Sequence, residues 1–174
     1  MSRAKGLVLI NTGAGKGKTT AALGMLLRAW GHNMKVIMLQ FVKSSTADYG
    51  EHRAAHRMGV EILARGAGFT KRGSNADKNR RLTVELWNMA TDKICSGDYH
   101  MVILDELTYP LRHRWLSVAE VLDVLRNRPG EVHIVITGRD APQELIDFAD
   151  MVVEMREVKH HLQKGIKAQP GVEF

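Results

Sequence analysis

The stretch INTGAGKGKTTAA, which begins at Ile10, constrains the fold more than any other part of this chain. It joins an apolar run to a segment with helical periodicity, and a strand–loop–helix unit of this kind is the context of a nucleotide phosphate loop. The usual pattern is G-x-x-x-x-G-K-[ST], and counting back from Gly17 puts Thr12 where the first glycine normally stands. We therefore expect phosphate binding by a loop of altered geometry.

The loop carries the groups that a polyphosphate requires. Its glycines let backbone N–H groups turn toward an anion at the positive end of the following helix. Lys18 is expected to contact phosphate directly, Lys16 adds a second cation, and Thr19 supplies the hydroxyl that usually joins a Mg²⁺ shell. The residues predicted to bind ATP in this loop are Thr12, Gly13, Ala14, Gly15, Lys16, Gly17, Lys18, Thr19 and Thr20.

Apolar runs bounded by turn-forming residues recur along the chain, with helical segments between them. They are continuous rather than alternating, as expected for parallel strands that are covered on both faces. The predicted strands span residues 6–11, 35–42, 100–106, 132–137 and 151–155, with a weaker candidate at 60–63. This alternation predicts an α/β fold, doubly wound, with a mainly parallel sheet of about five or six strands, similar to P-loop NTPases.

The helices between these strands have recognisable ends. Residues 19–30 are apolar almost all round and stop at a glycine, so this helix is expected to be buried against the sheet. Ser74 and Ser117 each begin a capping-box pattern that starts a further helix. A proline begins a short helix over residues 142–148.

At 174 residues the chain is too short for two ordinary domains, so we expect one domain over residues 1–174. Residues 43–71 and 156–174 resist assignment, and unassigned stretches of that length in a compact domain tend to be functional. The tail, residues 156–174, is expected to contribute to the active site.

Composition excludes several classes of protein. Cys95 is the only cysteine and cannot form an internal disulfide, and no apolar run is long enough to cross a bilayer. A cytoplasmic protein without a membrane partner is therefore expected.

The formal charge is +6, and residues 53–81 hold eight Lys/Arg residues against two acidic residues. A solvated basic surface is the favoured interpretation, attraction of an anionic substrate is a second, and nucleic-acid binding is a third that no further motif supports.

Charged residues also follow two of the predicted strands, at the edge where ligands bind in open α/β sheets. Asp105 and Glu106 end the apolar run HMVILDE, where they would hold the Mg²⁺ of a triphosphate, although either could instead cap the next segment. Arg139 follows another strand, and a phosphate-facing role and a surface ion pair with Asp140 stay open as equal alternatives. Arg28 is the one charge in its apolar helix and is interpreted as a buried or snorkelling structural arginine.

Four segments occur in an order that resembles the phosphate-loop family of ATP:corrinoid adenosyltransferases. They are the variant glycine loop, LDELTY, ITGRDAP and the tail EMREVKHHLQKGIKAQPGVEF, and the similarity runs from about Gly6 to the C-terminus. The resemblance implies a doubly wound α/β enzyme, usually a homodimer, that makes adenosylcobalamin-type coenzymes. In this family the Co(I) centre of a reduced corrinoid attacks the 5′ carbon of ATP, and the whole triphosphate leaves.

The resemblance also implies roles for individual residues. Lys18 and Glu106 become the catalytic pair, with Thr19, Asp105 and Glu106 as ligands of Mg²⁺ or Mn²⁺. Arg28 matches an arginine of the family's first helix that reaches the nucleotide, and Arg139 joins the ATP-binding set. A flavodoxin-like or flavin electron donor is implied as a partner.

The segment GAGFTKRG matches the part of the family that covers the corrin plane. Phe69 is the corrinoid-binding residue that the resemblance implies there. The family commonly has a tryptophan two residues later, where this chain has Lys71.

Two alternative functions stay open beside the adenosyltransferase: a hydrolytic P-loop ATPase or kinase, and a nucleotide-dependent nucleic-acid binder.

Overall fold

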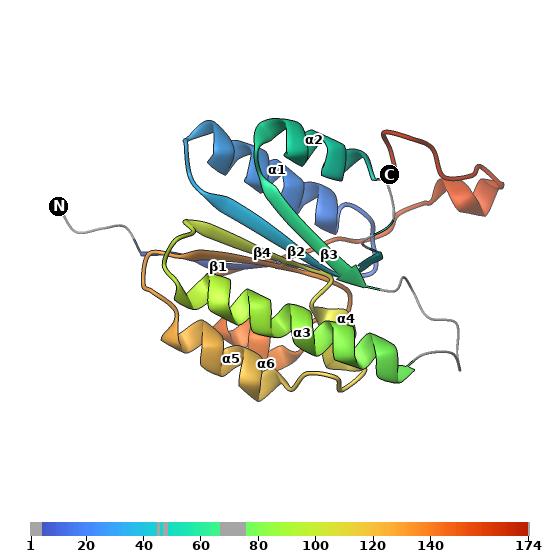
Figure 1. Cartoon of the computed structure of the whole chain (residues 1–174). Helices are drawn as coiled ribbons and strands as arrows, with labels where there is room; N and C mark the ends of the chain where they lie inside the picture. Colours follow the sequence, from blue (N-terminus) through green and yellow to red (C-terminus); the bar gives the residue numbers. More distant parts are fainter. Residues whose placement is uncertain (1–4, 45, 47–48, 67–75, 174) are drawn as a thin grey trace.

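A computed structural model describes residues 5–44, 46, 49–66 and 76–173, in which a six-stranded sheet lies between two layers of helices (Figure 1). All neighbouring strands are parallel, in the order β3-β2-β4-β5-β1-β6. The strands are β1 (Val8–Thr12), β2 (Val36–Ser44), β3 (Glu61–Gly66), β4 (Met101–Asp105), β5 (His133–Thr137) and β6 (Met151–Glu154).

The helices divide between the two faces of this sheet. In Figure 1, α1 and α2 lie on one side, and α3, α4, α5 and α6 lie on the other. They are α1 (Lys18–Gly31), α2 (Gly50–Met58), α3 (Ala76–Cys95), α4 (Thr108–Arg112), α5 (Val118–Asn127) and α6 (Gln143–Phe148), with a short 3₁₀ turn η1 (His161–Lys164) in the tail.

Each face of the sheet has its own apolar core. Along β4, Val102 and Leu104 belong to the larger cluster beneath α3 and α5, whereas Ile103 belongs to the smaller cluster beneath α1. All three side chains are fully buried. Because successive side chains point to opposite faces, a strand covered on both sides must be apolar throughout. This is the physical reason for the continuous apolar runs in the sequence.

The predicted α/β class and its parallel sheet are confirmed, and the weak candidate at residues 60–63 is the edge strand β3. The capping box at Ser117 is present, with the Ser117 hydroxyl accepting from the Glu120 N–H at the start of α5. The box predicted at Ser74 lies outside the described residues.

The prediction for α1 is wrong in one respect, because the helix is buried on one side only. Ala22, Leu26 and Ala29 face the sheet, whereas Leu27 is 56% exposed and Trp30 is 43% exposed. Arg28 is exposed in the last turn, so it is not the buried arginine that was one of the two structural interpretations.

Two short helices escaped the sequence analysis. Helix α2 falls inside the unassigned residues 43–71, and Ala55 is its one buried residue, so the helix has no apolar stripe to detect. Helix α4 has five residues and contains Pro110, which disfavours a helix in any prediction from propensity.

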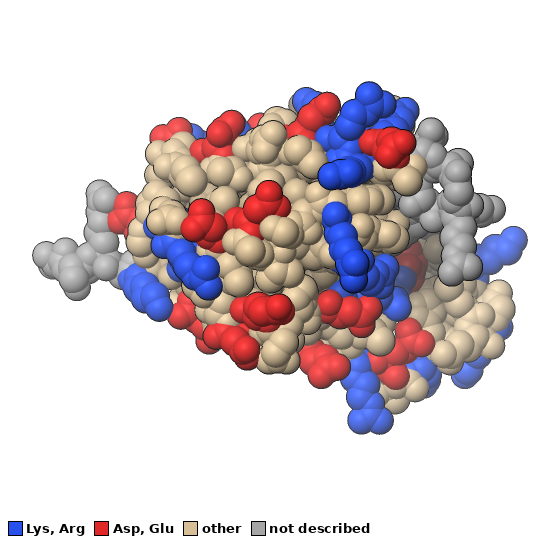
Figure 2. Space-filling model, turned by 90° about the horizontal axis from the view of Figure 1, so that it is seen from below, with Lys and Arg blue, Asp and Glu red and all other residues tan. Residues whose placement is uncertain are grey.

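The described basic residues of segment 53–81 do not gather on one face. Those on α2 and those at the start of α3 lie in opposite helical layers (Figure 1). Acidic and basic side chains are interspersed over the face seen in Figure 2. Within the described part of the chain, no helix combines the length and apolarity needed to cross a membrane.

Candidate active site

The glycine loop runs from the end of β1 to the first turn of α1. Gly13 and Gly17 have φ values of 95° and 103°, in the left-handed region that favours glycine. Gly15 packs against the start of the tail: its N–H donates to the carbonyl oxygen of Met155 at 2.7 Å, and a Cβ there would lie 2.7 Å from the same oxygen. The glycines therefore form the turn, and Gly15 also leaves space for the backbone that follows β6 to pack closely against the loop.

Thr12 is the last residue of β1 rather than part of the turn. Its side chain is 6% exposed, and its hydroxyl accepts a hydrogen bond from the N–H of Ala141 at 3.2 Å. Its carbonyl accepts from the N–H of Met155 at 2.8 Å. The left-handed turn falls on Gly13 instead, so the loop tolerates a threonine at the position of the usual first glycine.

Lys18 points back into the loop. Its ammonium donates to the carbonyl oxygens of Gly13 at 3.0 Å and Gly15 at 2.6 Å, and the residue is only 5% exposed. Burial lowers the pKa of Lys18, and the nearby Glu106 and Asp105 carboxylates oppose that shift. The ammonium is thus held by two loop carbonyls at the amino end of α1.

Asp105 ends β4 and anchors a buried hydrogen-bond network. Its Oδ1 atom accepts from the hydroxyls of Thr19 at 2.8 Å and Thr137 at 2.7 Å. Its Oδ2 atom accepts from the amide of Gln40 at 3.1 Å, and Gln40 in turn contacts His52 at 2.6 Å. Asp105 is fully buried, and both carboxylate oxygens have partners. The network joins α1, β2, α2, β4 and β5 at one sheet edge.

Glu106 follows Asp105 in a strained conformation. Its φ is 59°, which is unusual for a residue with a side chain, and its N–H donates to the hydroxyl of Thr137 at 2.9 Å. Burial raises the pKa of Glu106, and the neighbouring Asp105 carboxylate adds to the shift. Such a carboxyl gains stability from a bound cation. Thr19, Asp105 and Glu106 offer only oxygen donors, and that donor set suits Mg²⁺ or Mn²⁺.

Arg139 lies on the same edge, beyond β5. It lines the cavity above the loop, while Asp140 pairs with Arg112 at 3.2 Å. Gly138 before it has a φ of 145°, and a Cβ there would lie 2.0 Å from the hydroxyl of Thr108. The hydroxyl of Thr108 donates to the carbonyl oxygen of Arg139 at 2.6 Å. This close approach directs the chain so that Arg139 borders the cavity.

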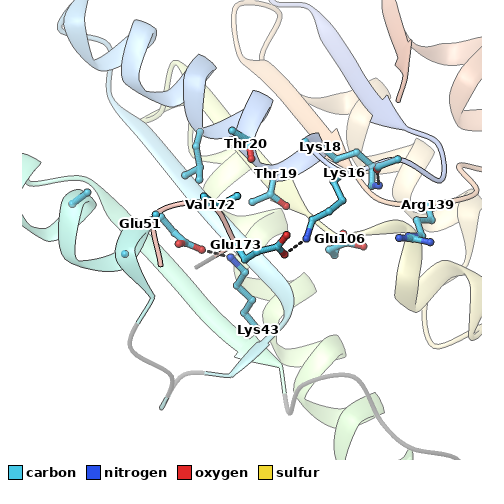
Figure 3. A pocket seen from close by; sticks show the side chains of 16 residues that line it. Lys16, Lys18, Thr19, Thr20, Lys43, Glu51, Glu106, Arg139, Val172 and Glu173 are labelled. Atoms are coloured by element: carbon cyan, nitrogen blue, oxygen red, sulfur yellow. Dashed lines mark hydrogen bonds and ion pairs between the residues drawn. The ribbon is translucent and has the colours of Figure 1, made fainter. Parts of the chain in front are cut away.

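These groups surround a cavity of about 560 Å³ (Figure 3), within the range of typical ligand pockets. We call the floor the glycine loop, residues 13–19, with Glu106 and the fully buried Asp105 and Thr137; of these, residues 15–19 and Glu106 line the cavity. The cover consists of residues 171–173 of the tail, which line the same cavity. Glu173 of the cover accepts a hydrogen bond from the ammonium of Lys16 (Figure 3). Lys43 and Glu51 form a second ion pair at the rim.

Eight of the predicted site residues line this cavity, Glu106 among them, whereas Thr12, Gly13 and Asp105 lie outside its lining. Thr20 and Arg139 line it, together with residues 15–19. Ala14 is exposed in the loop, outside the lining. Arg28 is ten residues beyond Lys18, so along the helix it stands about 15 Å from the loop, and it does not line the cavity. Phe69 and Lys71 lie outside the described residues.

Sequence reasoning missed three residues that complete the site. Gln40 had a detectable signal, because it is a polar residue within an apolar run of β2 and is fully buried. Thr137 also ends an apolar run and is fully buried, but its two hydrogen bonds depend on the neighbouring strand β4. Glu173 had no local signal, since its contact with Lys16 spans 157 positions.

Comparisons with known proteins agree on one family. The family model for "ATP:corrinoid adenosyltransferase BtuR/CobO/CobP" matches residues 4–174. The corrinoid adenosyltransferase of Escherichia coli (strain K12) is 38% identical over 170 residues, which cover 98% of this chain and 86% of that protein. The corrinoid adenosyltransferase of Pseudomonas aeruginosa is 40% identical over 172 residues, which cover 98% and 84%.

A solved structure extends the comparison to the fold. The flagellar accessory protein FlaH from Methanocaldococcus jannaschii superposes with a TM-score of 0.56 over 88% of this chain and 77% of its own. The two sequences are 11% identical, so this likeness concerns the fold alone.

Proposed function

Because the chain belongs to the ATP:corrinoid adenosyltransferase family, we propose that the cavity above its glycine loop holds the ATP whose 5′-deoxyadenosyl group is transferred to a reduced corrinoid. The observation that carries this assignment is the buried Thr19–Asp105–Thr137 network beside Lys18. It fixes the Thr19 hydroxyl and the backbone of Glu106, which line, together with Lys18, a cavity large enough for a nucleotide.

The reaction is a displacement at carbon. The Co(I) centre of the corrinoid substrate supplies an electron pair and forms a bond to the 5′ carbon of ATP. The bond from that carbon to the triphosphate oxygen breaks, triphosphate leaves with the bonding pair, and the cobalt becomes Co(III). The protein is not required to move a proton, so its contribution is to position the two substrates and to neutralise the leaving group.

Cationic and N–H groups of the floor suit that leaving group. We assign contact with the triphosphate to Lys18 and the loop N–H groups, with Lys16, Thr20 and Arg139 at the edges of the cavity. Thr19 and Glu106 would hold Mg²⁺ or Mn²⁺, which supplies charge neutralisation to the triphosphate when bound. Asp105 acts as a positioning residue, because its hydrogen bond fixes the Thr19 hydroxyl. Arg28 stays a prediction from the resemblance, and its exposed position away from the cavity gives it no support.

The corrinoid is proposed to lie against Phe69, as the resemblance implies. An aromatic side chain in place of the lower cobalt ligand makes Co(II) easier to reduce. Phe69→Ala is therefore expected to slow adenosylation from Co(II) corrinoid more than adenosylation from chemically reduced Co(I). Equal losses in the two assays would remove this role from Phe69.

We also propose that the protein is a homodimer that acts in the cytoplasm and receives electrons from a flavodoxin-like or flavin donor. Support for a protein–protein interface comes from β6, an edge strand on which Met151, Val152 and Val153 are 37–40% exposed. Apolar edge strands are usually covered in native proteins. Sedimentation as a monomer would contradict the dimer, and failure of reduced flavin to support turnover from Co(II) would contradict the donor.

Product analysis tests the proposed reaction. Purified protein with ATP and Mg²⁺ is expected to release triphosphate only when Co(I) corrinoid is present, in equal amount to the adenosylated corrinoid. Release of ADP and phosphate without corrinoid would identify a hydrolytic ATPase instead. Salt-dependent retention of DNA or RNA without any ATP turnover would favour a nucleic-acid binder.

A further inference from the structure

A second group of potential metal ligands lies in the tail and includes Glu173 of the cover. His160, His161 and Glu173 each offer one ligand atom, and these atoms all lie within 4.8 Å of one another. The two histidines lie at the start of η1, and the fold brings Glu173 back to them across the eleven residues 162–172. The two imidazole rings are stacked with their centroids 4.5 Å apart. All three residues are partly accessible to solvent.

We propose that His160, His161 and Glu173 form a binding site for a divalent transition metal of the Zn²⁺ class, and that the bound metal fastens the tail over the glycine loop. Two imidazoles and one carboxylate are a donor set of zinc sites that keep a fourth position open. Imidazole donors favour Zn²⁺, Co²⁺, Ni²⁺ or Cu²⁺ over Mg²⁺. This site therefore differs in metal preference from the all-oxygen group at Thr19, Asp105 and Glu106.

The contacts of Glu173 leave room for a metal. Its Oε2 atom accepts from Lys16, whereas its Oε1 atom lies 3.5 Å from Nε2 of His161. A metal between Oε1 and the imidazoles would replace only the second contact. Ligand atoms of a tetrahedral zinc stand roughly 3.4 Å apart, given metal–ligand bonds of about 2.0–2.1 Å. A closure of at most about 1.4 Å by partly exposed side chains, from 4.8 Å to roughly 3.4 Å, would thus complete the site.

His160 must release one weak contact to take part. Its Nδ1 atom accepts a hydrogen bond from the N–H of Leu162 at 3.2 Å, which places the proton of the neutral ring on Nε2. Coordination through either nitrogen gives up this bond at the exposed start of η1. The site therefore forms with a local change in the turn, and the sheet and the helices are unaffected.

The metal would link the tail to the floor through Glu173. Lys16 belongs to the glycine loop, and its partner Glu173 would be a metal ligand at the same time. The chain between the histidines and Glu173 would then be closed into a metal-bound loop. Trypsin sites at Lys164 and Lys167 lie within this loop, which gives a readout independent of catalysis.

The test uses the full chain without a histidine tag, stripped of metal with a chelator and titrated with Co²⁺. One equivalent is expected to give the intense visible absorption of four-coordinate Co²⁺, and Zn²⁺ is expected to displace it while excess Mg²⁺ does not. His161→Ala and Glu173→Gln should each weaken Co²⁺ binding by at least about tenfold, because even the loss of an outer-shell partner costs about 10–100-fold. Zn²⁺ should slow tryptic cleavage at Lys164 and Lys167 in the unaltered chain and not in His161→Ala.

His56→Ala is the matched control. His52 and His56 stand one turn apart on α2 and border a separate exposed hollow, so they are the rival site for a metal. Unchanged Co²⁺ binding in His56→Ala supports the tail site. Unchanged binding in His161→Ala, or a loss confined to His56→Ala, overturns the proposal. Neither measurement involves turnover, so the outcome stands apart from that of the product assay.

Discussion

The floor and the cover of the cavity are built by different physical means. Asp105 and Thr137 in the floor are fully buried and have hydrogen-bond partners on neighbouring elements. In the cover, Val172 is 72% exposed, and Glu173 is held through Lys16 and His161. Buried hydrogen-bonded groups are costly to disturb, whereas exposed ion pairs contribute little to stability. Changes in the floor should therefore affect folding and chemistry together, while changes in the cover should affect ATP access alone.

Lys18→Ala should have the largest effect on activity. The ammonium is a cation of the floor fixed by two loop carbonyls, and we assign it to the leaving triphosphate. Removal of one preorganised electrostatic group typically costs about 10²–10³ in rate. We expect a loss of at least that size in triphosphate release from saturating ATP and Co(I) corrinoid. Nearly normal rates would show that the loop does not hold the leaving group.

Asp105→Asn tests the coupling of folding and chemistry in the floor. The amide keeps the shape but replaces one acceptor oxygen with an NH2 group, which then faces either the Gln40 amide or the Thr19 and Thr137 hydroxyls, all of them donors. We expect the free energy of unfolding to fall by about 1–3 kcal/mol, as for a buried donor left unpaired, with a loss of turnover.

Asp140→Asn provides the control for that measurement. Asp140 is exposed, pairs with Arg112, and has a φ of 54° that asparagine also tolerates. Urea denaturation should give a change within about 0.5 kcal/mol for this variant. Equal losses in the two variants would show that the floor is not stabilised by the Asp105 network.

The floor was predictable from the sequence as far as it depends on local pattern. The glycine loop and the Asp105-Glu106 pair each follow an apolar run, and parallel strands bring their carboxyl ends to one edge. The partners of Asp105 were not predictable in this way, because Gln40 and Thr137 reach it only after β2, β4 and β5 pair. The cover was less predictable still. The tail, residues 156–174, was expected to contribute to the active site, but its local composition does not indicate that residues 171–173 return to the loop.

Glu106→Gln should separate stability from activity within the floor. Burial raises the pKa of Glu106 above the ordinary value of 4.5, so the folded state holds this proton more tightly than the unfolded state. The contribution of Glu106 to stability is therefore present at low pH and is lost as the pH rises through the folded pKa. At neutral pH the variant should be more stable than the unaltered protein and less active, because it lacks a cation ligand.

Denaturation at two pH values checks the sign of the change in the free energy of unfolding. The stability difference between Glu106→Gln and the unaltered protein should be large at neutral pH and should shrink near pH 4.5. Glu144→Gln, at an exposed position on α6, should show no such trend. If the variant is less stable at neutral pH, the prediction is wrong, and the negative charge of Glu106 is already compensated by Lys18 and Arg139.

The smallest effects are expected at the contact between cover and floor, and they should have opposite signs. Lys16 forms a hydrogen-bonded ion pair with Glu173 across the loop, and we assign the same lysine to the triphosphate.

Lys16→Ala removes a cation, so ATP should bind more weakly. Glu173→Gln frees the lysine from a competing carboxylate, so ATP should bind more tightly. Each shift should stay within about fivefold, since ion pairs near the surface contribute about 0.2–1 kcal/mol, and the free energy of unfolding should change by no more than about 1 kcal/mol. Calorimetric ATP titrations of both variants measure the two signs. Weaker ATP binding in Glu173→Gln would contradict this competition, because the carboxylate would then stabilise the nucleotide-bound state and the cover would belong to the binding site itself.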